Sequence, residues 1–134
     1  MKILILGGTK YLGLEIANLL VDSGYKVTVV SRNKTINKDA SFIQCDRKDF
    51  IKLKKVVEQA KPDYILDMIC FDQNDAIDIN ELFRDGALDQ LSHYVMISTS
   101  LIYNYTDAYE EVFRGILPGD SDKYTNNKIN AEIE

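Results

Sequence analysis

The chain has 134 residues, 46% of them apolar, which suits one domain with one packed core. Its net charge of −5 repels phosphates and so disfavours general nucleic-acid binding. No apolar run approaches the roughly 18 residues of a membrane span, and no signal peptide precedes the first strand, so we expect a cytoplasmic protein. Cys45 and Cys70 form no close metal-type pair, so we expect reduced thiols and no metal site.

The first thirty residues have the pattern of a strand, a glycine-rich turn, a helix and a second strand. Lys2 to Leu6 (KILIL) is a continuous apolar run, typical of a strand buried on both faces. Apolar residues then recur at helical spacing as far as Gly24, a residue type that often ends a helix. Lys26 to Val30 (KVTVV) is rich in β-branched residues and predicts the second strand.

Strands and helices continue to alternate along the chain. We predict strands at Ser41–Gln44, Asp63–Ile69 and Tyr94–Ile97, helices at Asp49–Gln59, Asn74–Phe83 and Lys123–Glu134, and a loop over Asn104–Asp122. This alternation is typical of an α/β fold with a doubly wound parallel sheet.

The turn after the first strand, Gly7-Gly8-Thr9-Lys10-Tyr11-Leu12-Gly13, is predicted to hold the pyrophosphate of a dinucleotide. Its glycines permit a tight turn and a close approach of the backbone, and the helix that follows directs its N-terminus at the charge. A buried strand before the turn and an amphipathic helix after it are the context that the dinucleotide-binding fingerprint requires. The alternative is a glycine-rich turn without a ligand.

The end of the second strand bears on which dinucleotide is bound. NAD-specific sites place an acid there for the ribose 2′-hydroxyl, whereas this chain has Ser31 and Arg32. Arg32, together with Lys10 of the glycine turn, is placed to pair with a 2′-phosphate. These two cations favour NADP, with NAD as the alternative.

Later segments supply further candidate contacts. Asp46, after the third strand, is interpreted either as an adenine contact or as an acid at the entry of the next helix. Met68 and Ile69 are expected to flank the cofactor ribose through their backbone. His93, the single histidine, is predicted to be a surface or edge residue rather than a base.

A second set of residues points to acid–base chemistry. Tyr124 and Lys128 are four residues apart in a predicted helix and therefore share a face. A nearby ammonium lowers the pKa of a phenol, which is ordinarily about 10. The hydroxyls of Ser98, Thr99 and Ser100 lie at the carboxyl end of the fifth strand, where one could donate to a substrate oxygen or simply cap the strand.

Three segments together, GGTKYLG, ISTSLIY and YTNNKINAE, resemble the short-chain dehydrogenase/reductase superfamily, and most closely its extended and atypical epimerase/dehydratase branch. The resemblance covers the whole chain and implies one NAD(P)-binding Rossmann domain over residues 1–134. It implies Tyr124 as the catalytic acid–base and Lys128 as the residue that orients the nicotinamide ribose. It implies Thr99 as the third catalytic residue, ahead of its two serine neighbours.

The same resemblance implies hydride transfer on a nucleotide-sugar or similar small polyol, and a homodimer. Lys10 departs from the family pattern, which has a glycine there, and the substrate-binding region that follows the lysine helix is absent. Helical sequence runs to Glu134 without a cap. We therefore expect an N-terminal fragment that binds cofactor with little turnover and self-associates through apolar surface at Ile129 and Ile133.

Two alternatives remain open. One is a non-catalytic dinucleotide-binding relative of the same fold. The other is RNA binding, because the run Asp46-Arg47-x-Asp49 is similar to a subgroup that includes the chloroplast stem-loop-binding proteins.

Overall fold

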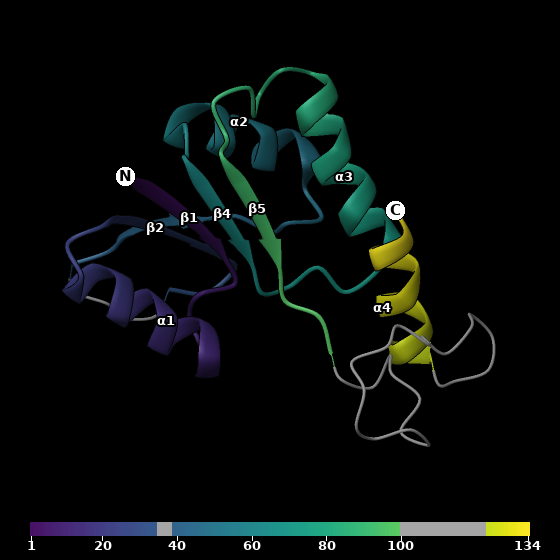
Figure 1. The fold of residues 1–134 in the computed structure, drawn as a ribbon, viewed down its shortest axis with the longest axis horizontal. Helices are drawn as coiled ribbons and strands as arrows, with labels where there is room; N and C mark the ends of the chain where they lie inside the picture. The colour runs from purple at the N-terminus through teal and green to yellow at the C-terminus, as the bar shows by residue number, and fades with distance from the viewer. Residues whose placement is uncertain (35–38, 100–122) are drawn as a thin grey trace.

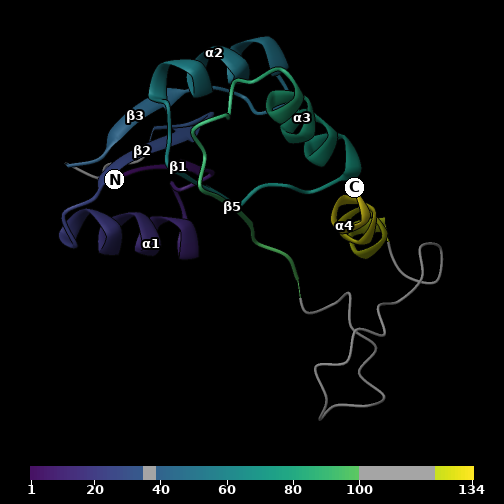
Figure 2. The ribbon, with the colours of Figure 1, turned by 45° about the horizontal axis from the view of Figure 1, so that its top comes forward.

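The computed structural model describes residues 1–34, 39–99 and 123–134. The strands are β1 (Lys2–Leu6), β2 (Lys26–Ser31), β3 (Ser41–Gln44), β4 (Tyr64–Asp67) and β5 (His93–Met96), and the helices are α1 (Tyr11–Asp22), α2 (Phe50–Ala60), α3 (Gln73–Arg84) and α4 (Lys123–Ile133). The sheet has the order β3-β2-β1-β4-β5, and every neighbouring pair is parallel (Figure 1, with β3 labelled in Figure 2). The predicted doubly wound α/β fold is confirmed.

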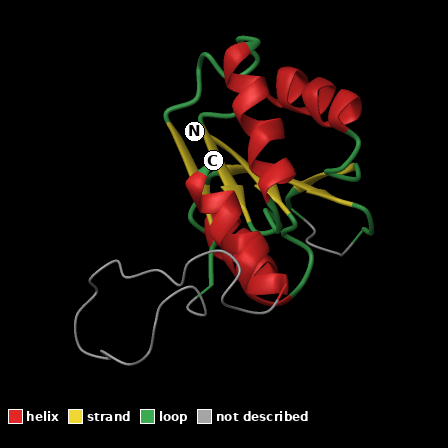
Figure 3. Cartoon of the chain, turned by 90° about the vertical axis from the view of Figure 1, so that its right-hand side faces the viewer, coloured by secondary structure: helices red, strands yellow, loops and turns green. Residues whose placement is uncertain are grey.

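The helices form layers on the two faces of the sheet. Figure 2 shows α1 on one face and α2 and α3 on the other. The last helix, α4, lies against α3 (Figures 1 and 3). None of the described helices has the length and apolar character needed to cross a membrane.

Alternating side chains of β1 build both halves of the core. Leu4 and Leu6 pack on the side of α2 and α3, with Leu53 among their neighbours, whereas Ile3 and Ile5 pack on the side of α1. All of these residues are buried, as the continuous apolar run predicted. Each such side chain contributes about 1.5–3 kcal/mol when it is fully buried.

Short polar residues set the start of two helices. The Asp49 carboxylate accepts a hydrogen bond from the Lys52 amide at 3.0 Å and so caps α2. Asp72 caps α3 in a reciprocal pair with Asp75, in which each side chain accepts from the other residue's amide. These caps fix where the chain enters each helix from the carboxyl edge of the sheet.

The predicted bounds of β2, β4 and β5 are wrong by one or two residues. β4 ends at Asp67 rather than at Ile69, because the Asp67 carboxylate accepts a hydrogen bond from the Ile69 amide at 3.0 Å and the chain turns there. β5 starts at His93, whose ring stacks on Tyr64 at a centroid distance of 5.3 Å. His93 is exposed on this edge strand, in agreement with the prediction.

The prediction for the last helix was partly wrong. Ile129 is 7% exposed rather than bare, because α4 docks along α3. The side chains of Gln73 and Asn80 both donate to Glu134 across this contact. Ile133 is 71% exposed, as expected. The predicted loop over residues 104–122 lies outside the described residues.

Candidate functional site

The glycine turn opens the carboxyl edge of the sheet directly after β1. Gly7 has a φ of +88°, a conformation that favours glycine, and its amide donates to the Val30 carbonyl at 2.8 Å. A Cβ on Gly7 would lie 2.5 Å from Cγ2 of Ile69, so the turn also packs against the chain that follows β4. Gly8 follows in the same turn and is buried.

Gly13 lets α1 approach the turn closely. A Cβ on Gly13 would lie 3.0 Å from the Gly7 carbonyl oxygen and 3.2 Å from the Gly8 Cα. Both atoms belong to the backbone, so they have little freedom to move aside. The first turn of α1 is therefore held directly over the end of β1, the arrangement expected of a dinucleotide-binding turn.

The N-terminus of α1 suits an anion. Lys10 occupies the N-cap position with an extended backbone and makes no side-chain capping hydrogen bond, and the first turn contains no acid. Tyr11 has a φ of +46° and is 88% exposed, and Leu12 is also exposed. The amides at the start of a helix carry partial positive charge, which favours a bound pyrophosphate. The residues present thus fit the pyrophosphate of a dinucleotide.

Thr9 connects the glycine turn to the end of β2. It is buried, and its hydroxyl oxygen lies 3.2 Å from the Ser31 hydroxyl oxygen. Arg32 follows Ser31 and is exposed, and its carbonyl accepts from the Gln44 side chain at 2.9 Å. The structure thus brings Ser31 to the turn and places Arg32 one residue beyond it on the same edge.

Asp46 shapes the turn after β3. One oxygen of its carboxylate accepts from the Lys48 amide at 3.0 Å, and its carbonyl accepts from the Asp49 amide at 3.0 Å. Asp46 therefore lies at the entry of α2, while Asp49 is the residue that caps the helix. A contact with adenine stays a prediction.

Met68 and Ile69 lie beside the glycine turn. The Met68 amide donates to the Leu6 carbonyl at 2.9 Å, and the Met68 side chain would touch a Cβ on Gly13 at 3.3 Å. The backbone after β4 is therefore adjacent to the turn, where a ribose contact was expected.

Lys128 is the most buried of the three predicted catalytic residues, at 2% exposed. Its ammonium donates to the Cys70 carbonyl at 2.7 Å and to the Ile97 carbonyl at 2.8 Å. Burial lowers its pKa, against the smaller opposing effect of neighbouring acidic groups such as Asp67. An ammonium has three N–H donors, and the described part of the chain accepts from two of them.

Lys128 places α4 beside the end of β5. Tyr124 lies one helical turn before it and is 44% exposed. Thr99 is half-buried and Ser98 is exposed, two and one residues after Ile97. Ser100 lies outside the described residues. The structure therefore brings the strand-end hydroxyls and the lysine helix to the same edge of the sheet.

A cluster of buried charges that the sequence patterns did not predict lies at this edge, and we call it the Arg47 cluster: Arg47, Asp67 and Asp75. Their side chains are 4%, 0% and 0% exposed. Asp67, an acid inside the otherwise apolar stretch Tyr64–Ile69, was the available signal, because a buried acid requires a partner. Within the described residues, no group of histidine, cysteine and acidic side chains is arranged to hold a metal ion.

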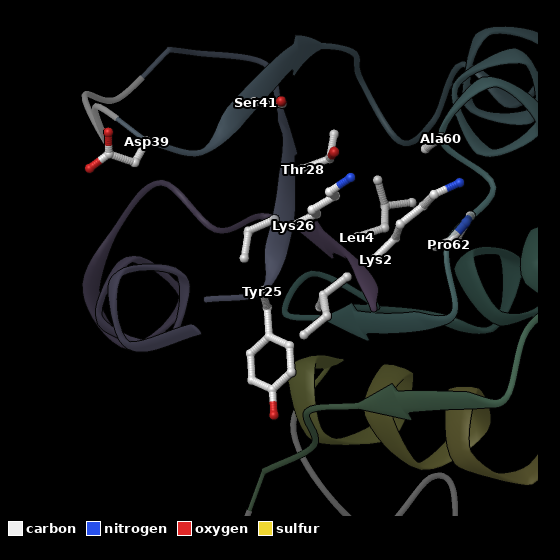
Figure 4. A pocket seen from close by; sticks show the side chains of 11 residues that line it. Lys2, Leu4, Tyr25, Lys26, Thr28, Asp39, Ser41, Ala60 and Pro62 are labelled. Atoms are coloured by element: carbon white, nitrogen blue, oxygen red, sulfur yellow. The ribbon is translucent and has the colours of Figure 1, made fainter. Parts of the chain in front are cut away.

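A separate groove of about 320 Å³ lies at the opposite edge, where the strands begin (Figure 4). Lys2, Lys26 and Ser41 line it from the first residues of β1, β2 and β3. Ligands of doubly wound sheets bind at the carboxyl ends of the strands, so this groove is distinct from the candidate site.

Comparison with known proteins matches the chain to one family and to solved structures of the same fold. The family model described as the NAD dependent epimerase/dehydratase family matches residues 3–131. The fold resembles dTDP-glucose 4,6-dehydratase from Bacillus anthracis in complex with NAD, with a TM-score of 0.78 and 15% identity over 99% of this chain and 48% of that one. It also resembles UDP-glucose 4-epimerase from Bifidobacterium longum in complex with NAD+ and UDP, with a TM-score of 0.76 and 12% identity over 99% of this chain and 47% of that one.

A sequence relative comes from Arabidopsis thaliana. The chloroplast stem-loop binding protein of 41 kDa b is 27% identical over 122 residues, which cover 79% of this chain and 31% of that protein. The chain thus spans about a third of this relative and about half the length of the solved structures.

Proposed function

Because the chain belongs to the NAD dependent epimerase/dehydratase family, we propose that it binds a nicotinamide dinucleotide at the carboxyl edge of its sheet. The observation that carries this proposal is the close approach of α1 to the glycine turn at Gly13, with no acid in the first helical turn. Together they leave a backbone surface with the positive partial charge and the shape that a pyrophosphate requires. Solved structures with the same fold contain NAD.

In this proposal the cofactor extends along the strand ends in both directions from the glycine turn. The adenosine half lies towards β2 and β3, where Arg32 and Lys10 supply positive charge for a 2′-phosphate and Asp46 contacts adenine. This placement supports NADP as the preferred cofactor. The nicotinamide half lies towards β4 and β5, beside Met68 and Ile69.

The reaction proposed is hydride transfer at a carbon that bears a hydroxyl or carbonyl group, with the nicotinamide ring supplying the redox chemistry when bound. Tyr124 moves the proton of the substrate oxygen, and Thr99 donates a hydrogen bond to that oxygen. Lys128 favours the phenolate of Tyr124 by its charge and offers its third N–H to the ribose. Its anchored position between Cys70 and Ile97 supports this role.

For the whole protein we propose a nucleotide-sugar or similar polyol as substrate, because dTDP-glucose and UDP-glucose enzymes share the fold. A cytoplasmic homodimer completes the proposal. The test is conversion of nucleotide-sugars by the whole protein, followed by chromatography of the sugar product, because an epimerase or dehydratase regenerates its nicotinamide cofactor in every cycle and shows no net change in its absorbance. Tyr124→Phe is expected to abolish turnover while cofactor affinity stays unchanged, and turnover that survives this substitution contradicts the mechanism. Cofactor binding by the whole protein without any turnover favours the non-catalytic alternative.

RNA binding is the second candidate function, and the Arabidopsis relative is the observation that favours it. The net charge of −5 opposes it, and Lys54 on the polar side of α2 is paired with Asp85 at 2.7 Å. Fluorescence anisotropy with an RNA stem-loop at low and moderate salt tests this second candidate function. Affinity that falls steeply with salt supports RNA binding, because phosphate contacts release counterions.

A further inference from the structure

The Arg47 cluster joins three segments that are distant in the sequence. Arg47 belongs to the turn after β3, and one terminal nitrogen of its guanidinium donates to the Asp67 carboxylate at 2.6 Å, at the end of β4. The other terminal nitrogen donates to the Asp75 carbonyl at 2.7 Å, and Nε lies 3.0 Å from Oδ1 of Asp75, in α3. A guanidinium is planar and directs its donors in fixed directions, so these contacts fix the three segments relative to one another.

Asp67 connects the Arg47 cluster to the start of the turn that follows β4. While its Oδ2 accepts from Arg47 and from the Tyr94 hydroxyl at 2.9 Å, its Oδ1 accepts from the Ile69 amide at 3.0 Å. The Ile69 side chain in turn fills the space above Gly7. The position of Asp67 therefore sets how this turn meets the glycine turn.

Asp75 holds the other end of the same turn. Its Oδ2 accepts from the Phe71 amide at 2.8 Å and from the Asp72 amide at 3.3 Å. Lys48, next to Arg47, bridges the Asp72 and Asp75 carboxylates at 2.8 and 2.7 Å. Both ends of the segment from Met68 to Asp72 are thus bound to carboxylates that contact the turn after β3.

These contacts link the two places where the halves of the cofactor are proposed to lie. Asp46, the proposed adenine contact, immediately precedes Arg47, whereas the segment held by Asp67 and Asp75 flanks the proposed site of the nicotinamide ribose. A ligand with two linked halves gains affinity only if both half-sites are aligned at once. Burial disfavours the charge of Arg47, but Asp67 and Asp75 outweigh this and raise its pKa, so the guanidinium stays charged.

We propose that Arg47 is a positioning residue that aligns the adenosine and nicotinamide half-sites through Asp67 and Asp75. This inference rests on the proposed dinucleotide binding. Because Arg47 is buried behind the strand ends, it acts through the turns it holds rather than by touching the cofactor. The expected signature is a loss of affinity for the complete dinucleotide that exceeds any loss for its separate halves.

The experiment is calorimetric titration of the full chain with NADPH, with NADH, and with the halves 2′-phospho-AMP, AMP and nicotinamide mononucleotide. Arg47→Lys keeps the positive charge but cannot maintain all three contacts, and Asp67→Asn keeps the shape of the side chain while it removes the charge. Both are expected to weaken dinucleotide binding about tenfold or more, with affinities for the halves within about twofold of the wild type. Leu53→Ala, a core substitution on α2, is the matched control for lost stability and is expected to leave the ratio of dinucleotide to half affinities unchanged.

The outcomes separate this inference from the proposed function. If the wild type binds neither dinucleotide, both fail. If the wild type binds and the two cluster variants bind equally well, the alignment role alone is overturned. It is also overturned if Leu53→Ala changes the ratio as much as the cluster variants do. If one cluster variant does not fold, the other is measured, and Arg47→Lys with unchanged dinucleotide affinity is sufficient to reject the proposal.

Discussion

The ammonium of Lys128 lies 2.7 Å from the carbonyl oxygen of Cys70, a residue 58 positions earlier in the chain. The same nitrogen donates to the Ile97 carbonyl, so one side chain of α4 binds the chain beyond both β4 and β5. Lys128 thereby joins the helix that carries Tyr124 to the carboxyl edge of the sheet. Lys128 thus has a structural role in addition to the catalytic role proposed for it.

Loss of Lys128 should destabilise the fold. Lys128→Met removes two hydrogen bonds from a charged donor, each worth about 1.5–3 kcal/mol, while it also removes the cost of burying an ammonium. We expect the free energy of unfolding to fall by about 1–3 kcal/mol, as measured by urea denaturation. Lys123→Met, at an exposed position of the same helix, is the control and should have little effect. Equal stability of the two variants would contradict the structural role.

The pH dependence of stability provides a second test of Lys128. Burial lowers its pKa in the folded chain, so between the folded and unfolded pKa values the unfolded chain binds more protons. Stability relative to Lys128→Met should therefore rise with pH through this window, which ends near the unfolded lysine pKa of about 10.4. Urea denaturation of both proteins at several alkaline pH values measures the difference. A difference that falls as pH rises would show that the lysine pKa is raised instead.

Arg32 is expected to set the preference between the two cofactors. Arg32→Ala should weaken NADPH binding by about ten- to a hundredfold, the equivalent of one lost charge-assisted bond, and leave NADH binding unchanged. Lys52→Ala removes the same charge from an exposed position on α2 and controls for net charge. Competitive titration measures both affinities. If Arg32→Ala weakens NADPH and NADH binding equally, Arg32 does not contact a 2′-phosphate.

The two cysteines should be unreactive in the folded protein. Cys45 and Cys70 are buried and free of disulfides, and burial raises the pKa of both thiols. Little thiolate is then present at neutral pH, and access is blocked. Ellman's reagent should react slowly with the native chain and promptly after unfolding in urea. Rapid reaction of either thiol in the native protein would show that its segment is open.

The sequence could predict features that depend on local patterns. The apolar run of β1, the position of Gly24 after α1 and the shared face of Tyr124 and Lys128 all follow from spacing along the chain. The parallel pairing of the strands follows from the alternation of strands and helices.

Features that depend on distant partners could not be predicted. Arg47 lies 20 residues from Asp67 and 28 from Asp75, and no local pattern specifies that one guanidinium reaches both. The burial of Ile129 required knowledge of how α4 docks on α3. The end of β4 required knowledge that the Asp67 side chain binds the Ile69 amide.

Calorimetric titration of the wild type, Gly13→Ala and Gly24→Ala with NADPH and NADH tests dinucleotide binding at the glycine turn most directly. A Cβ on Gly13 would press on the backbone of Gly7 and Gly8, whereas Gly24, with a φ of +83°, faces open space and only strains the chain. We predict that the wild type binds, that Gly13→Ala loses at least about tenfold in affinity, and that Gly24→Ala binds normally despite a stability loss of about 1 kcal/mol. No binding by the wild type, or equal binding by wild type and Gly13→Ala, would contradict a cofactor site at this turn.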